Sequence, residues 1–260
     1  MKTMFALAGT AIAVCSLAAA QDGAGRVVVP AQPGGHARQL NVHVLNHSIT
    51  VKTHGGSDVI VEAGSHPAPA ADGMRRIDGP RGLTIDEADN VIEIHADPMF
   101  QGPLAITVPA DTAVDLHTLN GNLSVEGVRG EVDTDTLNGH TELTGISGTV
   151  VAHSLNGPIH VVMDRVDPSK PLSFSSLNGS IDVTLPADLK ANVKFKTLRS
   201  EIYSDFEISL GGPASTEKDN SGGLKFRLRF DNNFEGAING GGVPVSFHTL
   251  HGTVYLRKKK

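Results

Sequence analysis

Tryptophan is absent from this 260-residue chain, and aromatic residues make up only 4% of it. So few rings argue against a cleft that holds a sugar by stacking, and they leave aliphatic side chains to build the core. The only cysteine is Cys15, which excludes an intramolecular disulfide. The formal net charge of −6 argues against a nucleic-acid partner, because such a partner requires dense positive charge.

Motifs of the common enzyme classes are lacking as well. The sequence has no Gly-x-Ser-x-Gly nucleophile elbow and no His-Glu-x-x-His zinc motif. The glycine cluster Gly240 to Gly242 is not followed by the Lys and Ser/Thr of a phosphate-binding loop. We therefore predict that the protein is not an enzyme and that it carries no cofactor.

The first twenty residues have the layout of a signal peptide. A positive charge at Lys2 precedes an apolar run from Met4 to Leu17, and three alanines form a small-residue cleavage site before Gln21. The run is too short for a stable membrane span. We expect an exported protein whose mature chain begins near Gln21, located in the periplasm, the cell envelope or outside the cell. Lipidation of Cys15 is disfavoured because Val14 stands where a small residue is required.

The most informative pattern is the tripeptide Leu-Asn-Gly, which recurs four times at spacings of 18, 18 and 22 residues. Apolar and polar residues alternate on both sides of each copy, as in half-buried strands. Each copy therefore predicts a strand, a structural Asn-Gly turn in which glycine adopts a positive φ, and a second strand. The four predicted turns are Asn120-Gly121, Asn138-Gly139, Asn156-Gly157 and Asn178-Gly179.

An antiparallel meander is the rival interpretation of Asn-Gly turns between strands. Identical flanks in every copy favour a parallel stack, in which residue i lies on residue i+18. We predict an all-β, single-stranded parallel β-solenoid of about 18–22 residues per coil, right-handed as parallel crossovers usually are. The pattern further predicts one continuous stack from Val114 to Ser200, with Leu137 in its apolar interior.

Weaker copies at Val42–Val51 and Val245–Leu256 extend the repeat in both directions. We therefore assign residues 1–20 to the signal peptide, 21–39 to a flexible segment, 40–257 to the solenoid and 258–260 to a basic tail. Stretches rich in small residues predict loop insertions near 63–82 and 211–223.

Alignment of the copies places His117, Asp135 and His153 in one outward column, about 4.8 Å apart per coil. Imidazole and carboxylate at this separation could hold a divalent transition metal. The column continues as Ser175, Lys196 and His248, however, as expected for an unconstrained surface position, so we predict no metal site. The repeated asparagines form a second column, whose stacked amides are expected to hydrogen-bond as a structural ladder.

The signal peptide, the short repeated strands, the Leu-Asn-Gly turns and the bends Gly127–Gly130 and Gly145–Gly148 resemble the bacterial DUF4097 family of candidate adhesins. That family is similar to the adhesin-head (GIN) domains, which are parallel β-helices. The resemblance covers residues 40–257 and is strongest from Val114 to Leu185. It implies a protein of the cell envelope or surface, and it supplies no catalytic motif.

We therefore expect an exported, non-enzymatic cell-envelope β-solenoid that serves as an adhesin or surface interaction protein. Its partner is an unknown surface or envelope ligand, protein or glycan, with no nucleic acid and no membrane span after signal cleavage. Two alternatives stay open. One is a polysaccharide-binding or polysaccharide-active β-helix, and the other is a structural or stress-related envelope protein without an external ligand.

Overall fold

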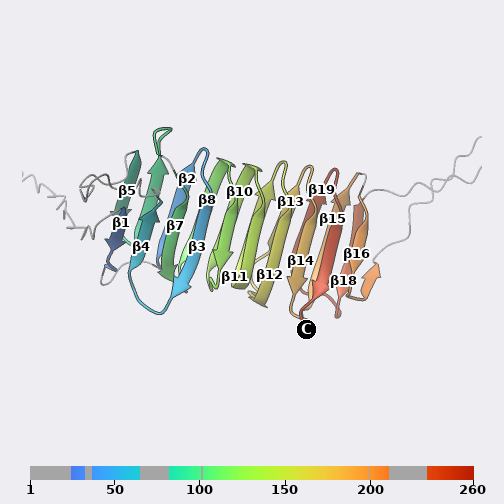
Figure 1. The fold of residues 1–260 in the computed structure, drawn as a ribbon. Helices are drawn as coiled ribbons and strands as arrows, with labels where there is room; N and C mark the ends of the chain where they lie inside the picture. The colour runs from blue at the N-terminus through green and yellow to red at the C-terminus, as the bar shows by residue number, and fades with distance from the viewer. Residues whose placement is uncertain (1–24, 33–36, 65–81, 101, 199, 211–232) are drawn as a thin grey trace, which may run out of the picture.

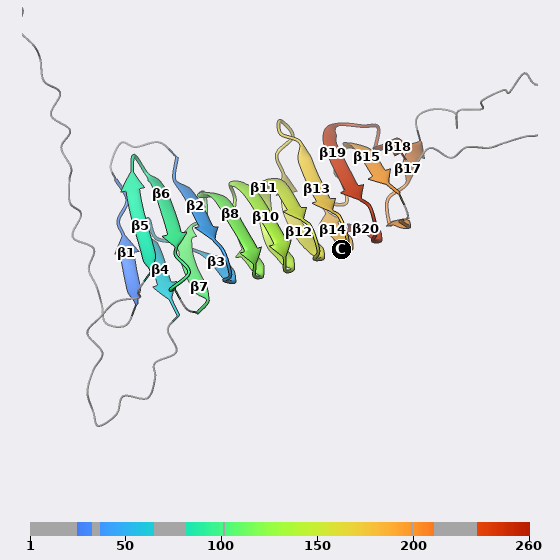
Figure 2. The ribbon, with the colours of Figure 1, turned by 90° about the horizontal axis from the view of Figure 1, so that it is seen from above.

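The computed structural model describes residues 25–32, 37–64, 82–100, 102–198, 200–210 and 233–260. The predicted signal peptide, most of the predicted loop near 63–82 and all of the predicted loop near 211–223 lie outside the described residues. The described part of the chain forms twenty strands and contains no helix. These strands form an elongated, flattened stack (Figures 1 and 2).

The stack has two long faces, which we call sheet A and sheet B. In spatial order, the strands of sheet B are β5 (Leu83–Ala88), β6 (Val91–Ala96), β2 (Gln39–Val44), β8 (Ala113–Asn120), β10 (Glu131–Asn138), the second half of β11 (Thr141–Ser154), β13 (Leu172–Ser176), β19 (Val243–Thr249), β15 (Ala191–Thr197), β18 (Asn233–Ile238) and β17 (Ile208–Leu210). Those of sheet A are β1 (Arg26–Val29), β4 (Val59–Ala63), β7 (Leu104–Pro109), β3 (Ile49–His54), β9 (Leu123–Glu126), the first half of β11, β12 (Ile159–Val166), β14 (Ile181–Leu185), β20 (Val254–Lys258) and β16 (Ile202–Ser204).

The predicted parallel solenoid is confirmed. Each central coil contributes one strand to sheet B, turns at Leu-Asn-Gly and contributes the next strand to sheet A. Val114 pairs in register with Val132, and Val132 pairs with Val150, as a repeat of 18 residues requires. Alternate side chains such as Leu116 and Val125 point inward and are fully buried between the sheets. The core is therefore a set of aliphatic columns that run along the solenoid axis.

The order of the coils differs from the prediction of one continuous stack up to Ser200. β19 lies between β13 and β15, so the C-terminal coil separates two coils that are neighbours in the sequence. Inside the core, the ring of Phe247 stacks on Phe174 at 5.4 Å and on Phe195 at 4.9 Å between ring centroids. At the other end, β2 lies between β6 and β8 in the same manner.

The backbone also approaches closely where the C-terminal coil packs on β13 and β14. A Cβ atom at Gly252 would lie 2.1 Å from the carbonyl oxygen of Gly179. Only glycine fits there, and the coil that continues the chain after β14 has Ser200 at the equivalent position. The C-terminal coil has this glycine next to Gly179, and the coil with Ser200 packs on the other side of the C-terminal coil.

The same kind of contact, and not a positive φ as predicted, accounts for glycine in the Asn-Gly turns. A Cβ atom at Gly139 would lie 1.9 Å from the carbonyl oxygen of Gly121. No residue of the four Asn-Gly pairs has a positive φ, whereas Gly127 and Gly145 in the opposite bends do. Glycine is therefore required in these turns by the spacing of the coils and not by its backbone conformation.

Antiparallel strands lie beyond the parallel coils at both ends. β5 pairs with β6, and β4 pairs with β7 and with β1. At the other end, β18 pairs with β15 and with β17. Strand β1 falls within the segment 21–39 that we expected to be flexible. Residues Arg26–Val29 are instead ordered by their pairing with β4, and Val29 is buried.

The leucine of each Leu-Asn-Gly copy points outward, so the prediction that Leu137 lies in the interior is wrong. Its side chain is 38% exposed, whereas Leu143 on β11 is completely buried. Period-2 alternation explains the difference, because Val132, Thr134 and Thr136 face inward and Leu137 follows at the edge of the turn.

This pair of leucines provides a test of the inward columns. Leu143→Ala is expected to lower the free energy of unfolding by about 2–5 kcal/mol, because it leaves a cavity in a packed column. Leu137→Ala is expected to change it by about 0.5 kcal/mol or less, as exposed substitutions do. Urea unfolding followed by circular dichroism measures both values. A larger loss for Leu137→Ala than for Leu143→Ala would contradict the assignment of inward and outward positions.

Candidate functional site

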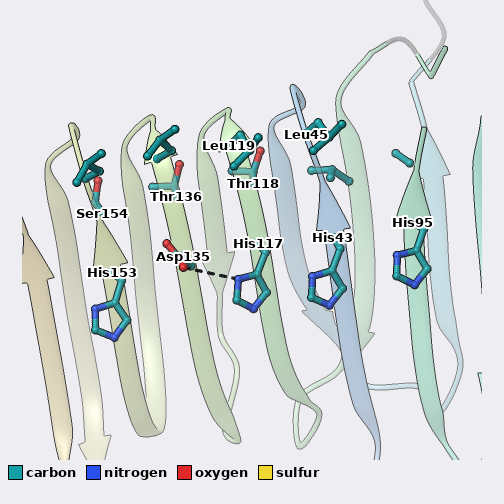
Figure 3. Close-up of a pocket in the computed structure, with 14 residues that line it drawn as sticks. His43, Leu45, His95, His117, Thr118, Leu119, Asp135, Thr136, His153 and Ser154 are labelled. Atoms are coloured by element: carbon teal, nitrogen blue, oxygen red, sulfur yellow. Dashed lines mark ion pairs between the residues drawn. The ribbon is translucent and has the colours of Figure 1, made fainter. Parts of the chain in front are cut away.

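A shallow groove of about 620 Å³ runs along the outer face of sheet B (Figure 3). It crosses five neighbouring strands, β6, β2, β8, β10 and β11. Imidazoles and Asp135 lie along one side and leucines lie along the other, and the floor between them is formed by the buried residues Ala96, Val44, Thr118, Thr136 and Ser154. The groove therefore follows the solenoid axis, with an imidazole row and a leucine row along its two sides.

The imidazole column is longer than the sequence predicted. His117, Asp135 and His153 do lie on adjacent strands, in the register that the repeat implies. Two further histidines precede them, because β2 and β6 continue the column with His43 and His95. The rings of His43 and His117 stack with centroids 4.8 Å apart and an interplanar angle of 8°. His43 and His95 stack at 5.6 Å.

Carboxylates accompany this column. The Nε2 atom of His117 lies 2.8 Å from Oδ1 of Asp115, and its Nδ1 atom lies 3.9 Å from Oδ2 of Asp135. Burial lowers the pKa of His43 below its ordinary value, and the neighbouring His117 lowers it further. Burial raises the pKa of Asp133, with the nearby Asp115 carboxylate adding to the effect. The stacked position of His43 thus favours its neutral form.

The side chains of this column do not gather around one point. Among the described residues, no three His, Cys, Asp or Glu side chains are placed to hold one ion. Stacked imidazoles present their faces to each other and their nitrogen atoms to the side, so neighbouring rings do not converge on a common point. The column is a row of hydrogen-bonding and aromatic groups that runs along the solenoid axis.

An apolar row lies beside the imidazole column on the same face. We call it the leucine row, and its members are Leu45, Leu119, Leu137, Leu155, Leu177, Leu250 and Leu198, in spatial order. All except Leu250 have exposed fractions between 38% and 53%, and they account for six of the nine large exposed hydrophobic side chains among the described residues. Exposed apolar groups are thus concentrated in a single line on sheet B.

The asparagine column borders the leucine row and fixes the turns. Nδ2 of Asn138 donates to Oδ1 of Asn120 at 2.7 Å, and Nδ2 of Asn156 donates to Oδ1 of Asn138 at 2.8 Å. The ladder extends to Asn46 at one end and Asn178 at the other. Below it, the hydroxyl of Ser176 donates to the carbonyl oxygen of Gly157. These bonds connect successive coils and hold the leucine row in position.

Sequence reasoning missed His43 and His95 as members of the imidazole column. Their strands are close to β8 in space but distant in the sequence, since His43 lies 74 residues before His117. One signal was available, because Leu45-Asn46 repeats the Leu-Asn of Leu119-Asn120. The segment of β6, which lies between these two copies in the sequence, has Asp97-Pro98 at the equivalent turn and gives no such signal.

Sheet A carries a different surface feature. The only two tyrosines of the chain, Tyr203 and Tyr255, stack with ring centroids 5.5 Å apart. The guanidinium of Arg257 lies 5.2 Å from the centre of the Tyr255 ring and pairs with Asp182. The two rings form an aromatic feature on sheet A, and Tyr203 is 52% exposed.

Comparison with known proteins gives one family. Residues 101–234 match the model of the family described as Toastrack DUF4097. No curated protein matches the chain in sequence. The described residues also contain no helix with the length and hydrophobicity of a membrane span.

Two solved structures are similar over most of the chain. One is a candidate cell adhesion protein from Clostridium sporogenes, with 10% identity, a TM-score of 0.38 and coverage of 90% of this chain and 99% of that chain. The other is a candidate adhesin from Bacteroides fragilis, with 9% identity, a TM-score of 0.34 and coverage of 90% of this chain and 96% of that chain.

The asparagine ladder provides a graded test. Asn138→Ala removes two ladder bonds and is expected to lower the free energy of unfolding by about 1–2 kcal/mol. Asn178→Ala removes a single ladder bond and is expected to cost about half as much. Thermal or urea unfolding compares the two variants. Equal values, or no effect of Asn138→Ala, would show that the ladder is incidental to the stability of the stack.

Proposed function

The chain belongs to the Toastrack DUF4097 family, and from this premise we propose that it is an exported cell-envelope protein that acts by binding, as an adhesin or surface interaction protein, and not by catalysis. The observation that carries the proposal is the outer face of sheet B. There, the leucine row and the imidazole column run side by side over consecutive parallel strands. Such a face offers repeated contacts to an elongated or flat partner.

The rigidity of this face suits binding. Its side chains project from strands whose main-chain hydrogen bonds fix them at intervals of about 4.8 Å. A partner therefore meets groups that are already in position, which reduces the entropy cost of association. An exposed apolar row rimmed by polar groups is also typical of an interaction surface.

Several features support binding over catalysis. The imidazoles of His43 and His117 stack on each other, and neither is hydrogen-bonded to a serine or threonine among the described residues. The outward column that contains Asp115 and Asp133 changes to Val151 and Ser173 within two coils. A catalytic site needs several fixed groups in one place, and a column that changes from coil to coil does not supply them.

Binding to isolated cell envelopes tests the proposal. The mature chain, residues 21–260, is labelled and titrated against envelopes of the organism that produces it, and against a glycan array. Leu137→Glu, which places a charge in the centre of the leucine row, is expected to weaken envelope binding at least tenfold. Tyr203→Ala is the control on sheet A, since it removes an exposed hydrophobic side chain from the other face, and it is expected to bind as the unaltered chain does.

Each other outcome has a definite meaning. Loss of binding in Tyr203→Ala but not in Leu137→Glu would place the site on sheet A. Together with binding on the glycan array, that result would favour the polysaccharide-binding alternative. Absence of envelope and glycan binding by the unaltered chain would favour a structural envelope role. Mass spectrometry of the protein from native cells is expected to show an N-terminus near Gln21. An intact Met1 would contradict export.

A further inference from the structure

The leucine row leaves a long apolar surface without a cover. Its seven members lie on, or directly after, seven consecutive strands, which gives a row of about 29 Å at the usual strand spacing. Contiguous exposed apolar groups rimmed by polar residues are typical of interaction sites. A partner must match both this row and the charged side chains that lie beside it.

Charges on this face are separated along the solenoid axis. Of the eight parallel strands in sheet B, those at the β6 end carry the outward acidic residues, which are Glu93, Asp115, Glu131, Asp133 and Asp135. The outward basic residues are Lys194 and Lys196, both on β15 at the other end. Between them, the outward positions of β13, β19 and the second half of β11 hold no Asp, Glu, Lys or Arg. The face is thus acidic at one end, uncharged in the middle and basic at the other end.

We propose that the partner of this face is a second copy of the chain, packed face to face with its solenoid axis reversed. The inference rests on the proposed function and names the partner of the same surface. A two-fold axis parallel to the strands, placed between β10 and β11, superimposes all eight parallel strands of each copy. Such an isologous contact is self-complementary, because each contact between two residues occurs twice.

This arrangement matches side chains by type. Leu137 meets the partner's Leu155, and Leu119 meets the partner's Leu177, so the leucine rows cover each other. At the ends, Glu93 faces the partner's Lys194. In the imidazole column, Asp135 faces the partner's His153. With both axes in the same direction, the acidic ends would instead meet each other, which is repulsive.

The available area is sufficient. Eight strands span about 38 Å along the axis and a strand of six residues spans about 20 Å, so the face covers on the order of 800 Å² per copy. That is the usual size of one side of a specific protein interface.

Sedimentation equilibrium of the mature chain over a range of concentrations tests the proposal directly. The unaltered chain is expected to form a dimer. Leu137→Glu is expected to raise the dissociation constant at least tenfold, and Tyr203→Ala is expected to leave it unchanged. The proposal would be overturned if the unaltered chain were monomeric at every concentration, or if Leu137→Glu left the dissociation constant unchanged.

A charge exchange tests the orientation of the two copies. Glu93→Lys and Lys194→Glu are each expected to weaken the dimer, because each places like charges opposite one another. The double variant is expected to recover most of the affinity, since the pair is restored with opposite signs. Circular dichroism of each variant confirms folding, which matters for Lys194 because it pairs with Glu235 in its own chain. Additive weakening in the folded double variant would exclude the reversed orientation.

Envelopes from a strain that lacks the gene separate this inference from the proposed function. If the partner is a second copy, these envelopes are expected to bind the mature chain far less than envelopes of the parent strain. Undiminished binding that still depends on Leu137, with a monomeric chain in solution, would retain the binding function and reject self-association. Absence of binding to either preparation, with a monomeric chain, would reject both.

Discussion

Main-chain hydrogen bonds between parallel coils are the constraint on which the rest of this structure depends. They run along the solenoid axis, so every coil must present its backbone to the next in register, about 4.8 Å away. This spacing requires glycine at Gly121, Gly139 and Gly157, whose Cβ atoms would collide with a carbonyl oxygen of the adjacent coil. It also brings equivalent side chains together, which allows the asparagine amides to bond in a ladder.

The same constraint produces the surface. A column that faces inward holds apolar side chains or small hydroxyls such as Thr134 and Thr136. A column that faces outward is free to vary, and on sheet B two outward columns retain a common character. The leucine row and the imidazole column are therefore properties of the stack and not of any one coil. Because β2 and β6 supply His43 and His95, the imidazole column is assembled from segments that lie far apart in the sequence. Binding along this face would follow from the regularity that holds the fold together.

Much of the architecture could be predicted from the repeat. The copies from Val114 to Leu185 predicted the parallel register, and the asparagine column followed from it. The insertion of β19 between β13 and β15 could not be predicted from spacing alone, since Phe247 and Phe195 each match Phe174 in type. The prediction that Leu137 is buried was wrong because it relied on hydrophobicity alone. The alternation of the strand already assigns the inward positions to Val132, Thr134 and Thr136. The strand Arg26–Val29 has no repeat signature, and only its pairing with β4 defines it.

The order of the coils is tested most directly by pairs of introduced cysteines, since Cys15 is the only natural one and lies in the predicted signal peptide. Ser175 lies opposite His248, and His248 lies opposite Lys196, so Ser175 and Lys196 are two strands apart. A disulfide spans about 4.4–6.8 Å between Cα atoms, which fits adjacent strands and not strands about 10 Å apart. The account predicts that mild oxidation forms a disulfide within one chain in the variant Ser175→Cys/His248→Cys. It predicts no disulfide in the variant Ser175→Cys/Lys196→Cys. Efficient cross-linking of the second pair, with none in the first, would contradict it.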